Sequence, residues 1–230
     1  MYVPFGNFES SMVSDSLTLV LAEIREKAAQ LGFEASNLSG SVYIFNGTTQ
    51  DDGNDTIDHY GGNVGFSQEG EGFSYELGIN YISDMGDTDT LGDVLEEASD
   101  YDYVEGIGGY LNLNLGPVSL FGEYITALDE FSVEHIDFKG SGAQPTAWNL
   151  EVGYTMTLGY KTIFGFSYQG TEEALGLELA KTRLLGLVSV GLNDNTSLSF
   201  EYAVSEDYAE NDGGSGEDAQ SAILQLAVEF

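Results

Sequence analysis

Alternation of apolar and polar residues with a period of two is the feature that most constrains this chain. It is clearest from Gln220 to Phe230, and the same period governs the preceding stretch from Ser197 to Ser205. Successive side chains of a β-strand point to opposite faces, whereas a helix repeats every 3.6 residues. The pattern therefore predicts amphipathic strands. In the final strand one face carries Ala222, Leu224, Leu226, Val228 and Phe230, and the other carries Ser221, Gln225 and Glu229.

The same unit recurs from residue 26 onward, as roughly ten residues of alternating character followed by a break rich in Gly, Asn, Asp or Ser. The breaks alternate between short and long, and this arrangement is typical of outer-membrane barrels, in which short turns face the periplasm. We expect full strands at 26–35, 40–48, 58–68, 72–83, 101–114, 117–126, 146–157, 160–169, 181–192, 197–205 and 220–230. Short breaks fall at 36–39, 69–71, 115–116, 158–159 and 193–195, and long breaks at 49–57, 84–100, 127–145, 170–180 and 206–219.

These observations predict an all-β fold, an antiparallel up-and-down transmembrane β-barrel with about 12 strands in this chain. One of them is a short remnant near residues 2–6. We expect a single domain over residues 1–230, with helix confined to short turns around Leu91 to Ala98. The segment from Asn7 to about Ala22 is too long for a turn, and we expect part of it to fold inward as a constriction. The alternative is a secreted β-sandwich with an apolar interior, but nothing in a sandwich demands the regular alternation of short and long breaks.

The two faces of each strand differ in what they can contact. A charged residue facing lipid near the midplane costs about 2–4 kcal/mol, so the apolar faces are expected to point outward. The outward set includes Phe73, Tyr75, Leu77, Ile79, Trp148, Leu150, Val152 and Tyr154, and the inward set includes Ser74, Glu76, Asn80, Asn149 and Glu151. Aromatic residues at the ends of outward faces form the expected girdle: Tyr81, Tyr124, Trp148, Tyr168 and Tyr202.

Composition excludes several function classes. The chain has 39 acidic and 6 basic residues, a formal net charge of −33. Nucleic acid is therefore not an expected partner, because phosphate contacts need clustered Lys and Arg. No apolar run is long enough for a membrane helix. The two histidines, His59 and His135, lie in or beside long breaks without a nucleophile motif such as G-x-S-x-G, so no catalytic residues and no cofactor are predicted.

Acidic residues dominate the side of the strands that is expected to line the lumen. Two strand cations accompany them, and such a lining would concentrate cations and repel anions. The competing interpretation is that these groups keep a wet interior soluble and form a hydrogen-bonded network across it. The predicted lumen-lining residues are Glu34, Glu76, Glu123, Glu151, Glu201, Lys161 and Arg183.

A metal site is not defined by the sequence. The loop Asp51-Asp52-Gly53-Asn54-Asp55 supplies closely spaced oxygen ligands for calcium, but it lacks the full twelve-residue EF-hand pattern. A charge run in a loop is usually solvated. The identity of any metal is therefore left open.

Three segments resemble the LbtU family of siderophore porins: Tyr2-Val3-Pro4-Phe5-Gly6, Tyr168-Gln169-Gly170-Thr171-Glu172-Glu173-Ala174-Leu175, and Val188-Ser189-Val190-Gly191 with Asn195 through Tyr202. The resemblance runs over most of the chain. It implies a barrel in the bacterial outer membrane that takes part in siderophore uptake. Because the P-F-G element lies at the start of the chain, the resemblance also implies that the chain corresponds to a carboxy-terminal portion of such a protein or to a shortened relative.

The function expected from these features is that of an outer-membrane porin or receptor for passage of a small solute, with a siderophore as the candidate. The expected partners are outer-membrane lipid, that solute, and the barrel-assembly machinery, which would recognise the terminal Phe230 after its alternating strand. A structural or adhesive barrel without transport is the alternative, and a lipid-acting outer-membrane enzyme is a third class.

Overall fold

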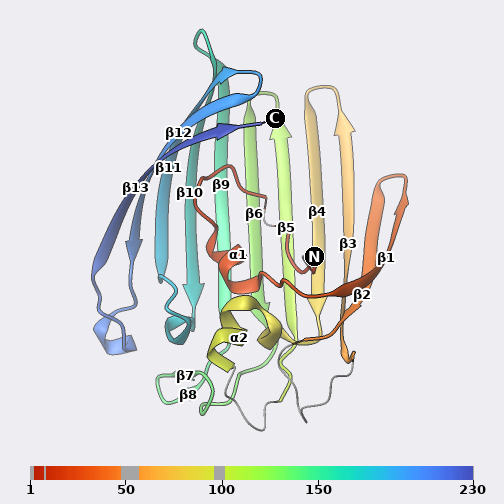
Figure 1. The fold of residues 1–230 in the computed structure, drawn as a ribbon, viewed down its shortest axis with the longest axis vertical. Helices are drawn as coiled ribbons and strands as arrows, with labels where there is room; N and C mark the ends of the chain where they lie inside the picture. The colour runs from red at the N-terminus through yellow and green to blue at the C-terminus, as the bar shows by residue number, and fades with distance from the viewer. Residues whose placement is uncertain (1–2, 8, 48–56, 96–101, 230) are drawn as a thin grey trace.

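A single antiparallel sheet of eleven strands forms the body of the protein (Figure 1). The computed structural model describes residues 3–7, 9–47, 57–95 and 102–229. Each sheet strand pairs with the next along the chain, which confirms the all-β up-and-down arrangement. The strands are β1 (Ala28–Ala35), β2 (Leu38–Phe45), β3 (His59–Gly70), β4 (Phe73–Ile82), β5 (Gly106–Leu115), β6 (Val118–Ala127), β9 (Thr146–Thr157), β10 (Lys161–Glu172), β11 (Thr182–Asn193), β12 (Thr196–Glu206) and β13 (Asp218–Val228).

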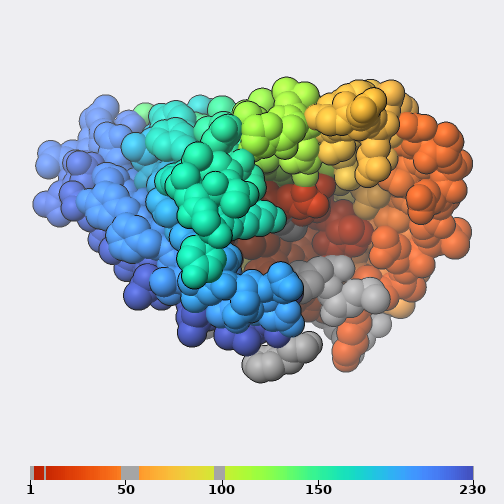
Figure 2. Space-filling model, turned by 90° about the horizontal axis from the view of Figure 1, so that it is seen from above, coloured from red at the N-terminus to blue at the C-terminus, as the bar shows by residue number. Residues whose placement is uncertain are grey.

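The sheet curls around a hollow that contains the amino-terminal segment (Figure 2). Its two edges are β1 and β13, and within the described residues these edges do not pair with each other, so the expected barrel closure is not seen. The expected strand remnant near residues 2–6 is wrong for the part that is described. Val3 and Phe5 are instead buried inside the curl, and the Val3 amide donates to the Ile24 carbonyl at 3.1 Å.

Short turns lie at one end of the sheet and long connections at the other, as predicted (Figure 1). The short turns join β1 to β2, β3 to β4, β5 to β6, β9 to β10 and β11 to β12. Gly72 and Gly159 occupy two of these turns with φ of 80° and 81°, a region that side chains with a Cβ rarely adopt. At these short turns the strand ends lie within a few residues of their predicted positions.

The long connections carry the short helices. They hold η1 (Met85–Asp87), α2 (Asp89–Leu95), the β7–β8 hairpin (Asp137–Phe138 and Ser141–Gly142), η2 (Leu175–Leu177) and η3 (Glu210–Asp212). The expected helical turn around Leu91 corresponds to α2. The helix α1 (Leu17–Ala22) was not predicted; its first turn is capped by Ser16, whose side chain accepts from the Leu19 amide. No helix in the described part of the chain is long and apolar enough to cross a membrane.

The two faces of the sheet follow the predicted assignment. Ile79 and Leu150 are 61% and 57% exposed on the outer face, whereas Asn80 and Glu151 are 5% and 6% exposed on the inner face. Trp148 packs edge to face against Tyr168 with ring centroids 4.9 Å apart, within the expected aromatic girdle. The large side chains of the outer face are therefore exposed as a band rather than buried in a core.

The apolar core lies inside the curl at the long-connection end, a feature that the sequence did not predict. It is formed where α1, α2 and the long connections pack against the lower ends of the sheet strands in the view of Figure 1. We call this cluster the end core; its fully buried members include Val3, Phe5, Leu17, Leu21, Tyr43, Phe45, Ile82, Met85, Leu91, Ile125 and Phe131. The described residues contain one large sheet and one two-stranded hairpin, not the two packed sheets of a sandwich.

The end core predicts a local stability difference within α2. Leu91 is fully buried, whereas Val94 of the same helix is 42% exposed. Leu91→Ala should destabilise the packing of α1 and α2 by about 2–5 kcal/mol, because it leaves a cavity. Val94→Ala should change it by less than about 0.5 kcal/mol. Amide hydrogen exchange would show faster exchange in α1 and α2 for Leu91→Ala alone, with β9 to β12 unchanged; equal exchange in both variants would contradict the assignment of this core.

Candidate functional site

The amino-terminal segment, defined here as Asn7 to Ser16, crosses the inner face of the sheet and binds its buried carboxylates. The first contact is at β6, where the Asn7 amide donates to Oε1 of Glu123 at 2.8 Å. Glu123 is 4% exposed. Because a buried carboxylate needs hydrogen-bond donors, the Asn7 amide supplies one of the donors that Glu123 requires inside the curl.

Glu151 on β9 makes the second attachment. Its Oε1 accepts from the Ser10 hydroxyl at 2.7 Å, and its Oε2 accepts from the Ser11 amide at 3.0 Å and the Ser11 hydroxyl at 3.1 Å. The Asn149 amide also donates to Oε1 at 2.9 Å. Four donors therefore surround one carboxylate, which fixes its orientation.

Glu201 on β12 makes the third attachment. Its Oε2 accepts from the Val13 amide at 2.6 Å, and its Oε1 accepts from the Ser14 amide at 3.2 Å and from the Ser14 hydroxyl. Next to it, Nη1 of Arg183 donates to the Asp15 carbonyl at 3.2 Å. Strands β6 and β9, which pair with each other, and the more distant β12 thus hold Asn7, Ser10, Ser11, Val13 and Ser14 of the segment.

Amide and hydroxyl side chains join these attachments to α1. The Leu17 amide donates to Oε1 of Gln169 at 3.0 Å, Gln169 donates to Ser167 at 3.0 Å, and Ser167 donates to Asn149 at 2.9 Å. Asn149 pairs with Glu123 on one side and with Gln169 on the other, so strand register alone brings these inner side chains into one row. The result is a connected polar network from α1 to Glu151.

The predicted lumen-lining residues fall into two groups. Glu123, Glu151 and Glu201 come together on the segment, with Arg183 beside them. Glu76 instead accepts from the Tyr110 hydroxyl at 2.6 Å. Glu34 and Lys161 are exposed: Glu34 lies on the edge strand β1, and Lys161 lies at the short-turn end of β10.

The arrangement around the first group is the hydrogen-bonded network that the sequence left open as the alternative to an ion-selective lining. The inward fold of the segment is confirmed. The serines that bind the carboxylates were not identified as site residues, although the stretch Glu9-Ser10-Ser11-Met12-Val13-Ser14 departs from the two-residue alternation. That departure was the available signal.

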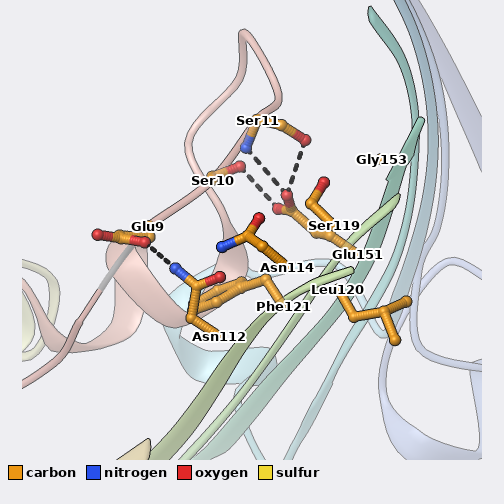
Figure 3. A pocket seen from close by; sticks show the side chains of 10 residues that line it. All are labelled: Glu9, Ser10, Ser11, Asn112, Asn114, Ser119, Leu120, Phe121, Glu151 and Gly153. Atoms are coloured by element: carbon orange, nitrogen blue, oxygen red, sulfur yellow. Dashed lines mark hydrogen bonds between the residues drawn. The ribbon is translucent and has the colours of Figure 1, made fainter. Parts of the chain in front are cut away.

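A polar cavity of about 360 Å³ lies between the segment and the inner wall formed by β5, β6 and β9 (Figure 3). Glu9 reaches across to the Asn112 amide, which donates to it, and Ser10 and Ser11 point toward Glu151. Oxygen and amide groups at this spacing can hold water or a small polar solute. The cavity is lined by Glu9, Ser10, Ser11, Asn112, Asn114, Ser119, Leu120, Phe121, Glu151 and Gly153.

The other residues weighed from the sequence lie elsewhere. The candidate calcium loop at residues 51–55 and the terminal Phe230 fall outside the described residues. His59 is buried at the long-connection end, at the start of β3, and His135 lies in the connection between β6 and β9.

Sequence comparison relates the chain to proteins designated UPF0422. No family model matches the chain, so the resemblance to the LbtU siderophore porins stays a prediction. A UPF0422 protein of Coxiella burnetii is 30% identical over 219 residues, covering 92% of this chain and 47% of that protein. One from Legionella pneumophila strain Paris is 28% identical over 232 residues, covering 90% of this chain and 42% of that protein. The chain therefore spans about half the length of these relatives.

Structure comparison finds the outer membrane channel DcaP of Acinetobacter baumannii. The superposition has a TM-score of 0.59 at 12% sequence identity and covers 98% of this chain and 68% of the channel. At this identity the likeness concerns the fold. The chain is thus a relative of the UPF0422 proteins in sequence and shares the strand architecture of an outer-membrane channel.

Proposed function

We propose that the protein is a channel of the bacterial outer membrane whose lumen is narrowed by its own amino-terminal segment. The observation that carries the proposal is the division of one eleven-stranded sheet into an exposed apolar outer face and a polar inner face that holds the segment. Lipid would contact the outer face, and solute would contact the inner face. The shared architecture with DcaP supports this proposal.

Insertion into a bilayer requires the backbone N–H and C=O groups of the two edge strands, β1 and β13, to be hydrogen-bonded. Each unpaired backbone group in hydrocarbon costs several kcal/mol, so lipid-exposed strand edges do not occur there. In the proposed channel β1 and β13 are therefore covered, either by each other or by additional strands.

The solute in this proposal is small and polar. The cavity beside Glu9 and Glu151 offers carboxylate, amide and hydroxyl groups, and the chain carries a formal net charge of −33. An acidic lumen attracts cations and repels anions. Passage of a siderophore is the finer proposal, and it is supported by the resemblance to LbtU porins alone.

A structural barrel without transport is the second candidate, and the end core favours it. Apolar side chains that include Leu17, Leu21 and Leu91 fill the long-connection end of the curl, where a solute would have to pass. Conductance measurements separate the two candidates. Catalysis is not part of either proposal.

The attachment of the segment generates a test of gating. Changing Glu123, Glu151 and Glu201 together to Gln keeps side-chain volume but removes the charge and leaves one acceptor oxygen in place of two, which weakens each attachment by at least about 1 kcal/mol. We expect the segment to detach more often, with a higher mean single-channel conductance in planar bilayers and a weaker preference for cations in reversal potentials under a salt gradient.

The matched control changes Glu34, Glu69 and Glu76 to Gln. This variant also removes three carboxylates. None of the three hydrogen-bonds to a described residue of the segment. This variant removes lumen charge without releasing the segment, so it should lack the rise in conductance that is expected of the first triple variant. Equal conductance in both triple variants would contradict gating by the segment, and the absence of conductance in all three proteins would favour the structural barrel.

The outer face generates a second test. Leu150 lies near the middle of β9 and is 57% exposed. If this position faces lipid, Leu150→Arg should destabilise the protein folded in phosphatidylcholine vesicles, lowering its free energy of unfolding by roughly 2–4 kcal/mol. Leu150→Met should have little effect. The measurement is the urea dependence of folding into vesicles; if the arginine variant matched the methionine variant, as expected at a water-exposed site, the membrane assignment would be wrong.

A further inference from the structure

Three metal-binding side chains from separate elements meet inside the end core. They are His59 at the start of β3, Asp84 immediately before η1, and Asp87 at the end of η1. One ligand atom from each lies within 4.8 Å of the other two. The three residues are 1%, 0% and 3% exposed, so this is a buried cluster and not a solvated acidic patch.

The His59 ring is the unusual member, because it is fully buried yet makes no hydrogen bond to any residue in the described part of the chain. Its Nδ1 lies 3.2 Å from Oδ2 of Asp87, and its Nε2 lies 3.3 Å from Oδ1 of Asp58. Neither pair has hydrogen-bond geometry. A separation of roughly 3 Å between a nitrogen and an oxygen is, however, what two ligands of one first-row metal show when each bond is about 2.0–2.2 Å long.

The surrounding contacts hold the ligands in place. The His59 ring packs between Phe45 and Tyr103, with centroid distances of 5.4 and 4.7 Å. Oδ1 of Asp84 accepts from the Gly86 amide at 2.9 Å and from the Val104 amide at 3.2 Å. Such contacts preorganise a site before an ion arrives.

The backbone at Gly47 approaches Asp87 closely. A Cβ at Gly47 would lie 2.0 Å from Oδ2 of Asp87, so a larger residue there would displace the carboxylate. On the far side of the His59 ring, the Tyr103 hydroxyl donates to Oδ2 of Asp58 at 3.0 Å. The carboxylate of Asp58 therefore lies on the Nε2 side of the ring, and Asp87 lies on the Nδ1 side.

We propose that His59, Asp84 and Asp87 bind one divalent transition-metal ion, through Nδ1 of the imidazole and one oxygen of each carboxylate. One nitrogen and two oxygens suit Zn²⁺ and its first-row neighbours, whereas Ca²⁺ and Mg²⁺ select oxygen ligands alone. The ion balances two buried negative charges. It joins the wall strand β3 to the η1–α2 connection, so its role is to clamp the end core to the sheet.

The primary experiment titrates Zn²⁺ into the 230-residue chain, folded without an affinity tag in detergent micelles and freed of metal by a chelator. Calorimetry in a millimolar Mg²⁺ background suppresses weak binding to the acidic surface. We expect one tight site per chain, and a rise in melting temperature of roughly 5–10 °C at a hundredfold excess over the dissociation constant. Absence of a tight site would overturn the proposal.

Two variants locate the site. Asp87→Asn removes one ligand charge at constant shape, and Asp129→Asn removes the same charge from an exposed loop position. Asp87→Asn should weaken Zn²⁺ binding by more than roughly 100-fold, because loss of an outer-shell partner alone costs 10–100-fold. Asp129→Asn should bind as the wild type does. Equal affinity in the two variants would place the ion elsewhere and overturn the assignment.

A second measurement keeps all three proposed ligands, so it does not depend on whether Asp87→Asn folds. The chain has two histidines, so in His135→Gln the only remaining imidazole is that of His59. Pulsed electron paramagnetic resonance of this variant loaded with one equivalent of Cu²⁺ should show nitrogen coupling from a single imidazole. A spectrum without imidazole nitrogen would overturn the proposal, whatever the affinity.

Discussion

Continuous backbone pairing between neighbouring strands is the constraint on which the rest of this structure depends. Once each strand pairs with the next, a side-chain period of two divides every strand between an outer and an inner face, and register sets which inner residues are neighbours. Glu123, Asn149 and Gln169 lie in one row for this reason. The polar network inside the curl is therefore a consequence of the backbone pairing between strands.

The need of buried carboxylates for hydrogen-bond donors explains why the amino-terminal segment lies inside. Carboxylates on β6, β9 and β12 are buried, and a chain with 6 basic residues has few cations to pair with them. Backbone amides and serine hydroxyls of the segment supply the donors instead. A segment of irregular backbone has unsatisfied N–H groups, so the carboxylates and the segment each satisfy the other.

The interior is divided along its length. At the short-turn end it is polar, with a cavity beside Glu151, and at the long-connection end it is filled by the end core. The proposed metal site of His59, Asp84 and Asp87 lies within that apolar end, where a buried ion pair or cluster experiences little screening. The proposed gated channel would combine an apolar, packed part at one end with a polar, hydrogen-bonded part at the other.

The sequence by itself determined the strands, their faces and the ends at which short and long connections lie, because a period of two and turn residues such as Gly72 are local properties. It also indicated that part of residues 7–22 folds inward, since this segment is too long for a turn. The partners of that segment were decided by the tertiary structure: the contacts of Asn7, Ser11 and Val13 span sequence separations of 116, 140 and 188 residues. The same holds for the end core and for the meeting of His59 with Asp84 and Asp87, because only the packing of the long connections against the curled sheet brings these residues together.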